Sequence, residues 1–356
     1  MMPSRPPLPA QTIFLAKPFS YFDAAGECLC PSPDDVSERA SRRVRTALVL
    51  DANVCLNLSN YARDAADDRV ETMCRQFLLT VEFTKVDVIP FFGCMELASK
   101  RNRSELDENK LSGITSNVAR ALKQSEASLA SGGKLFWRNE DSKQYEDETL
   151  GPMLEMLRFF YACFLKITEI RMRGSLKDRV VKNSMEFIDW CESLECHVAL
   201  VSQAAFALFG GAQEADKLLR LGGEKTPLDA AWGAAWDIWH AWASQSYLNS
   251  LNVEGWAQHT IFVTEDSAAA FIAGQCVPRA VFLEEGKPIL STNSTSFDFP
   301  YFRGKHQQLL EQWGERKMRQ LARLTNLATL RQKMDDMHLQ DVVAGLETSV
   351  MDAWEQ

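Results

Sequence analysis

Short apolar runs recur along the chain, and helical spacing of apolar residues follows most of them. The runs are residues 47–50, 86–90, 197–201, 260–264 and 279–283. Buried strands joined by helices form right-handed crossovers and parallel sheets. The pattern therefore predicts an α/β fold with a central parallel sheet of about five strands flanked by helices.

Two long segments depart from this rhythm. Residues at about 102–190 begin polar and continue with helical apolar spacing, which predicts a long helical insertion. Leucines near helical spacing after Pro300 predict a helical C-terminal extension. We therefore expect an N-terminal arm at 1–44, an α/β domain at 45–285 that contains the insertion, and the extension at 286–356.

Charge limits the partners that the surface can bind. The 356 residues carry a formal net charge of −9, so any contact with nucleic acid requires a local basic patch. Basic residues before the first strand and in the C-terminal extension are candidate contacts with a nucleic-acid backbone, although a solvated helix face or a partner surface explains them equally well. The candidates are Arg42, Arg43, Arg45, Arg316, Lys317 and Arg319.

The pattern also bears on the compartment. No apolar stretch reaches the roughly 20 residues of a membrane span, and the N-terminus lacks the pattern of a signal peptide. The nine cysteines are scattered in apolar contexts, as is typical of reduced thiols. We expect a cytoplasmic protein without a membrane contact.

Acidic residues stand near the ends of several of these units. Asp51 closes the first strand, Glu96 follows the second, Asp237 precedes the fourth and Asp266 follows it. Parallel strands place their carboxyl ends at one edge, so four acids should converge there. Such a cluster calls for a divalent cation, and oxygen ligands favour Mg²⁺ or Mn²⁺. Taken singly, Asp51 and Asp266 could each cap a helix, and Glu96 could pair with Lys100.

The helix expected at 227–240 offers two acids. Asp229 and Asp237 share one stripe, and both cannot be equal ligands of one ion because eight residues span about 12 Å. Asp229 follows Pro227 and suits the first turn of the helix, so Asp237 is favoured as the third acid. We expect the neighbouring stripe to pack in the core; it consists of Trp232, Trp236 and Trp239.

Four short motifs, in their order along the chain, resemble the acidic motifs of the PIN-like ribonucleases. They are residues 50–54, 95–97, 236–240 and 263–266. The resemblance implies that Asp51, Glu96, Asp237 and Asp266 bind the metal and that Asn53 and Thr264 support it, with Asp229 as a competitor for the third position. It further implies metal-dependent hydrolysis of RNA, in a toxin or defence effector or in RNA processing.

Two other functions compete with this interpretation. A phosphatase of the haloacid dehalogenase type also places an aspartate after its first strand, but it requires a second acid two residues later, where this chain has Asn53. A PIN-like scaffold could instead bind a protein partner, or a second copy of the chain, through the insertion or the C-terminal helices. The presence of all four acids favours the nuclease.

Overall fold

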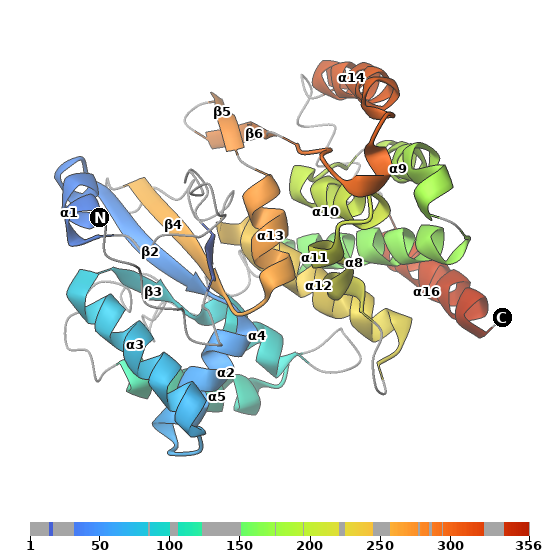
Figure 1. The fold of residues 1–356 in the computed structure, drawn as a ribbon. Helices are drawn as coiled ribbons and strands as arrows, with labels where there is room; N and C mark the ends of the chain where they lie inside the picture. Colours follow the sequence, from blue (N-terminus) through green and yellow to red (C-terminus); the bar gives the residue numbers. More distant parts are fainter. Residues whose placement is uncertain are drawn as a thin grey trace, which may run out of the picture. The chain divides into compact units, whose positions relative to one another are not determined.

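Two structural units make up the chain (Figure 1). The N-terminal unit comprises residues 1–144 and 243–270, and the C-terminal unit comprises residues 145–242 and 271–356. Each unit is described separately below. The computed structural model describes residues 14–16, 32–84, 86–99, 106–122, 151–174, 176–194, 196–220, 225–244, 257–276, 278–284, 287–293, 295–323 and 338–355.

A small sheet with strand order β1-β4-β2-β3 organises the N-terminal unit. β2 (Val44–Leu50) lies in the centre and pairs in parallel with both β3 (Asp87–Ile89) and β4 (Ala257–Thr264). β1 (Phe14–Ala16) is antiparallel to β4 at the edge. From Thr46 onwards, every residue of β2 is buried, as expected for a central strand covered on both faces.

The prediction of a central parallel sheet of about five strands is wrong. Three described strands are parallel, and residues 197–201 lead into the helix α10 (Ala199–Phe209) instead of forming a strand. Residues 279–283 lie in β5 (Pro278–Glu284), which pairs antiparallel with β6 (Lys287–Asn293) in a separate sheet. The fold is a mostly helical α/β fold with a small parallel sheet.

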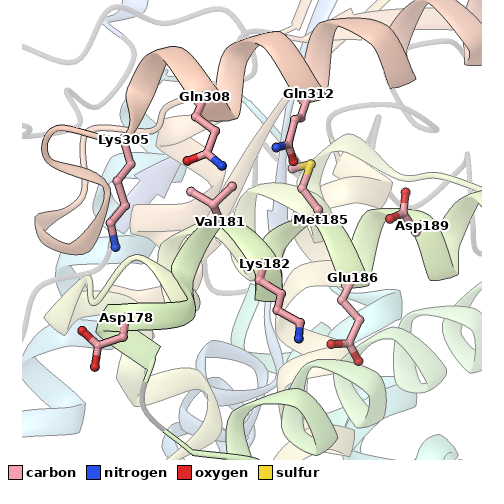
Figure 2. A pocket seen from close by; sticks show the side chains of 9 residues that line it. All are labelled: Asp178, Val181, Lys182, Met185, Glu186, Asp189, Lys305, Gln308 and Gln312. Carbon is pink, nitrogen blue, oxygen red and sulfur yellow. The ribbon is translucent and has the colours of Figure 1, made fainter.

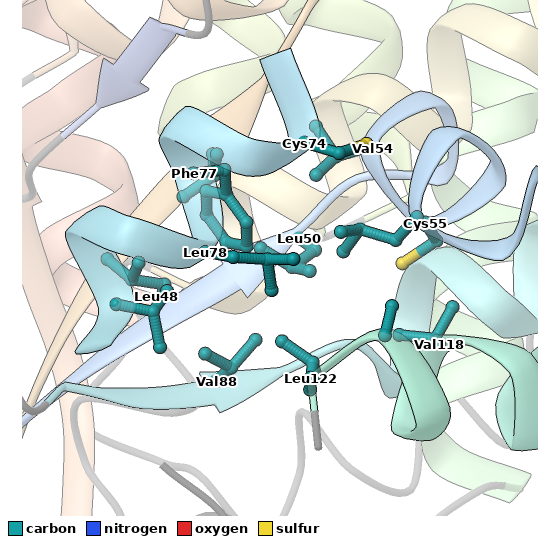
Figure 3. Close-up of a cluster of buried hydrophobic side chains, with 14 of the residues drawn as sticks. Leu48, Leu50, Val54, Cys55, Cys74, Phe77, Leu78, Val88, Val118 and Leu122 are labelled. Carbon is teal, nitrogen blue, oxygen red and sulfur yellow. The ribbon is translucent and has the colours of Figure 1, made fainter. Parts of the chain in front are cut away.

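Helices build the rest of the N-terminal unit. They are α1 (Pro33–Ser41), α2 (Ala52–Ala62), α3 (Asp68–Thr84), α4 (Phe91–Ala98), α5 (Glu108–Leu122) and the beginning of α13 (Ser267–Gln275). One apolar core joins the sheet to α2, α3, α4 and α5, with Leu48 and Leu50 of β2 packing among Val54, Phe77 and Val118 (Figure 3). This core fixes the strand ends that carry the acidic residues.

The C-terminal unit is helical apart from the β5–β6 hairpin. Its elements are α8 (Gly151–Met172), α9 (Leu176–Ser193), α10, α11 (Gln213–Asp216), the 3₁₀ helix η2 (Lys217–Leu219), α12 (Pro227–Trp242), η5 (Pro300–Phe302), α14 (His306–Arg323) and α16 (Leu339–Glu355). α8 packs against α9, α12 and α16. Trp236 and Trp239 are buried, so this part of the tryptophan stripe belongs to the core. Among the described residues, no helix is both long and apolar enough to span a membrane.

Candidate active site

Asp51 stands where the topology of the sheet favours a binding site. β3 and β4 flank β2 on opposite sides, so the carboxyl end of β2 is a topological switch point, where α/β sheets open a crevice. Asp51 follows β2 directly and is only 2% exposed. Its Oδ1 accepts a hydrogen bond of 2.8 Å from the backbone N–H of Val54 and thereby caps α2. The helix cap and the candidate site thus coincide at this residue.

Thr264 links Asp51 to the second strand end. Its hydroxyl donates to Oδ2 of Asp51 and accepts from the backbone N–H of Asp266 at 2.8 Å. The backbone N–H of Glu265 also donates to Oδ2 of Asp51, at 3.2 Å. The carboxyl ends of β2 and β4 are therefore joined through one buried threonine and one carboxylate. This contact is consistent with the supporting role that the resemblance implies for Thr264.

Asp266 caps a second helix at the same edge. Its Oδ1 accepts hydrogen bonds from the backbone N–H groups of Ala268, at 2.6 Å, and Ala269, at 3.0 Å, in the first turn of α13. The side chain is partly buried. As with Asp51, the capping role that the sequence allows is present together with a place in the acidic cluster.

Glu96 reaches this cluster from α4 because Gly93 lets that helix approach closely. A Cβ atom added at Gly93 would lie 2.5 Å from the carbonyl oxygen of Asp51, a distance that no real side chain tolerates. Glu96 lies three residues further along, near the same face of the helix. A glycine one turn before the acid thus sets the separation between Glu96 and Asp51.

Burial and like charge act on these carboxyl groups. Burial raises the pKa of Asp51 from 3.8 to about 6, although hydrogen bonds from Thr264 and Val54 oppose the rise. Burial, followed by the negative charges of Asp51 and Asp266, raises the pKa of Glu96 from 4.5 to about 8. The cluster therefore carries its negative charge at a cost, and a bound divalent cation would offset that cost.

The carboxylate oxygens of the cluster suit a hard cation, but their present arrangement does not form a complete metal site. Asp51, Glu96 and Asp266 offer carboxylate oxygens, the ligands that Mg²⁺ and Mn²⁺ prefer. In the described part of the chain, no group of three or more His, Cys, Asp or Glu side chains is arranged to hold a metal ion. Oδ1 of Asp51 accepts one hydrogen bond and can accept a further contact, whereas Oδ2 already accepts two. Metal binding would therefore require small side-chain rotations at this edge.

The two acids of α12 belong to the C-terminal unit. Asp237 is partly buried on that helix, so the acidic group within the N-terminal unit has three members, not four. Asp229 is exposed and forms a capping box: its Oδ2 accepts from the backbone N–H of Thr226 at 3.2 Å, and its own backbone N–H donates to the hydroxyl oxygen of Thr226 at 3.2 Å. Asp229 therefore has the helix-starting role that its position after Pro227 indicates.

The remaining candidates near β2 are exposed or partly buried. Asn53 is exposed in the first turn of α2. Arg42 forms an ion pair of 2.6 Å with Glu38. Arg43 is exposed and has a positive φ of 58° in the turn before β2, and Arg45 is partly buried on β2. Their role in RNA binding stays a prediction.

Among the basic candidates of α14, Arg316 already has a carboxylate partner. Its Nε and Nη2 bind the two carboxylate oxygens of Asp189 at 2.6 and 2.8 Å, which is a bidentate pair. The side chains of Lys317 and Arg319 lie outside the described residues. The geometry of α14 therefore supports an internal role for Arg316 more directly than a contact with RNA.

Sequence reasoning missed two residues beside the acids. The side-chain amide of Asn57 on α2 donates to Oε1 of Glu265, which lies between Thr264 and Asp266. Burial raises the pKa of Glu265, whereas Asn57 and the positive charge of Arg69 lower it. Glu265 could have been noticed as the middle residue of the Thr-x-Asp motif. Asn57 carries no such signal.

A separate pocket lies in the C-terminal unit between α9 and α14 (Figure 2). Its volume is about 610 Å³, and none of the three clustered acids lines it. Charged side chains of both signs line it together with two apolar side chains, Val181 and Met185. The lining residues are Asp178, Val181, Lys182, Met185, Glu186, Asp189, Lys305, Gln308 and Gln312.

Comparison with known proteins provides no family for the chain. The resemblance to the PIN-like ribonucleases therefore rests on its four motifs and on the geometry around Asp51. No protein-family model matches the sequence, and no curated protein or solved structure matches the chain.

Proposed function

We propose that the N-terminal unit is the catalytic part of a metal-dependent nuclease that hydrolyses phosphodiester bonds in RNA. The observation that carries the proposal is the group of Asp51, Glu96 and Asp266 at the switch point of the sheet, where burial and then the like charges of the two aspartates raise the pKa of Glu96. RNA is favoured over DNA by the resemblance to the PIN-like ribonucleases. A cytoplasmic location, with a role as a toxin or defence effector, belongs to the same proposal.

The three carboxylates would hold one or two Mg²⁺ or Mn²⁺ ions. Such an ion lowers the pKa of a bound water and stabilises negative charge on the phosphate. The chain itself positions the ligands: Thr264 fixes the carboxylate of Asp51, and the capping bonds of α13 fix that of Asp266. At neutral pH without an ion, Glu96 holds its proton, because its pKa is about 8.

A cleavage assay tests the proposal. Single-stranded RNA and DNA of one sequence, each with a fluorescent label, are incubated with the full chain in Mn²⁺, Mg²⁺ or EDTA. We expect cleavage of RNA in either metal and none in EDTA. Asp51→Asn and Asp266→Asn should each lower the rate by at least about 100-fold, because a misplaced ligand also misplaces the attacking water.

A matched control separates the site from helix capping. Asp67 is also a capping aspartate in the N-terminal unit, and at the exposed start of α3 its Oδ1 accepts from the backbone N–H of Val70 at 2.8 Å. Asp67→Asn should leave the rate within about twofold. Cleavage that persists in an Asp51→Asn/Asp266→Asn double variant would refute the proposal.

A protein-binding scaffold is the second candidate, and one surface feature favours it. Leu79 and Phe83 lie one turn apart on α3 and are 64% and 73% exposed. Exposed large apolar side chains that share a helix face are typical of contacts with another protein. A wild-type chain that neither cleaves RNA nor binds Mn²⁺ would favour this function over the nuclease.

A further inference from the structure

A side-chain contact between distant residues joins α2, the helix that Asp51 caps, to the turn before α13, the helix that Asp266 caps. Asn57 lies in the second turn of α2, and Glu265 lies in the turn between β4 and α13, 208 residues later. The amide nitrogen of Asn57 donates to Oε1 of Glu265, and both side chains are partly buried. The first of these helices begins after Asp51, and the second begins after Asp266.

Glu265 is held at both its backbone and its side chain. Its backbone N–H donates to Oδ2 of Asp51 at 3.2 Å, and its carboxylate accepts from Asn57. A shift of the turn would break both contacts together. The turn also carries Thr264 and Asp266, so its position decides how far Asp266 stands from Asp51.

We propose that Asn57 and Glu265 are positioning residues, which fix the turn bearing Asp266 against the helix capped by Asp51; this inference rests on the proposed metal-dependent function. The clustered carboxylates repel one another, and a contact between two other residues resists that repulsion before an ion arrives. Preorganisation of this kind tightens metal binding, because less free energy is spent on bringing the ligands together.

The contacts of Glu265 distinguish positioning from metal ligation. Its Oε1 is engaged by an amide of α2, and the positive charge of Arg69 acts on the same carboxylate. Both interactions come from helices, Asn57 from α2 and Arg69 from α3. A positioning role requires only an oxygen that accepts a hydrogen bond from Asn57, whereas a ligand role requires the negative charge.

Four variants separate these roles through the apparent affinity for Mn²⁺, measured by isothermal titration calorimetry. Asn57→Ala and Glu265→Ala break the contact from opposite sides, so one folded variant suffices. Each should weaken Mn²⁺ binding by about tenfold, as is usual for residues that orient metal ligands. Glu265→Gln keeps an accepting oxygen and should stay within about threefold of wild type. The double Ala variant should be no weaker than Glu265→Ala, because both changes remove one interaction.

Asn117→Ala provides a matched control, because it also removes an asparagine side-chain hydrogen bond of α2. The amide of Asn117 on α5 donates to the hydroxyl of Ser59 on α2 at 3.2 Å, away from the acids. Its loss should lower thermal stability about as much as Asn57→Ala does and leave Mn²⁺ affinity unchanged. A purely structural contact at Asn57 would behave in the same way as this control.

The outcomes distinguish the two proposals. The positioning role would be overturned if Asn57→Ala bound Mn²⁺ with wild-type affinity, or if Glu265→Gln lost as much affinity as Glu265→Ala. In that case, Mn²⁺ binding that still depended on Asp51 would leave the proposed function standing. Absence of Mn²⁺ binding by the wild-type chain would overturn both.

Discussion

Replacing Glu96 with glutamine should make the metal-free protein more stable at high pH. The folded protein holds the Glu96 proton up to a pKa of about 8, whereas an unfolded carboxyl group releases it near 4.5. The folded state binds more protons in this window, so the free energy of unfolding falls as pH rises from 4.5 to 8. Glutamine cannot ionise, and Glu96→Gln should therefore remove this part of the loss.

The pKa change sets the size of the effect. A rise of the pKa from 4.5 to about 8 corresponds to a loss of about 5 kcal/mol in the free energy of unfolding. The full loss is present only above pH 8. The Glu96 side chain is partly accessible to water, and screening there reduces the expected gain to about 2 kcal/mol. At pH 4 the variant and the wild type should agree within about 0.5 kcal/mol, because Glu96 is then mostly protonated in both the folded and the unfolded state.

Hydrogen exchange measures this difference within the N-terminal unit alone. Peptides from β2 and α2 report the free energy of local opening, and comparison at one pH cancels the intrinsic exchange rate. In EDTA at pH 9, these peptides should be more protected in Glu96→Gln than in wild type. Glu82→Gln changes an exposed glutamate on α3 and should have little effect. Equal protection of Glu96→Gln and wild type at both pH values would refute the reasoning.

Four further substitutions test three separate parts of the structure. Gly93→Ala forces a Cβ to within 2.5 Å of the Asp51 carbonyl oxygen, so thermal melting should show a loss of about 2 kcal/mol, and an unchanged melting temperature would contradict the close approach. Asp229→Asn keeps an accepting oxygen for Thr226, so it should lose less than about 1 kcal/mol and keep RNA cleavage. Asp237→Asn should abolish cleavage as the resemblance implies, and the reverse pattern would exchange their roles. Arg316→Gln should leave the salt dependence of RNA affinity unchanged, because its guanidinium is engaged within the protein, and a shallower slope would reassign it to the RNA.

The sequence is sufficient to locate the central strands because their signal is local. Four apolar residues before Asp51 and the run ending at Thr264 correspond to β2 and β4. An acid within two residues of the end of a buried strand is both a possible helix cap and a candidate ligand, and Asp51 and Asp266 both cap helices in the structure. Their metal-binding role stays a prediction.

The sequence predicts too many strands for the central sheet because apolar runs do not distinguish strands from buried helices. Every residue from Leu200 to Phe209 is buried, so α10 shows none of the helical alternation that would have revealed it. The run at 279–283 does form a strand, but its partner is β6, a segment that the apolar pattern did not indicate. Strand pairing depends on tertiary contacts, which a single sequence does not contain.

Contacts between residues far apart in the chain could not be predicted from the sequence either. Asn57 and Glu265 are 208 residues apart, and Arg316 and Asp189 are 127 apart. In the sequence, each of these residues looks like an ordinary surface position. The turn that brings Glu265 beside Asp51 exists only because β4 pairs with β2.

A crystal of the full chain soaked in MnCl₂, with anomalous data collected near the manganese edge, tests the central claim most directly. We predict an anomalous peak at roughly 2.0 to 2.6 Å from carboxylate oxygens of Asp51 and of Glu96 or Asp266. The same map shows whether Asp237 contributes a ligand. A well-ordered Asp51 without a peak beside it, at millimolar Mn²⁺, would contradict the claim that this sheet edge is a metal centre.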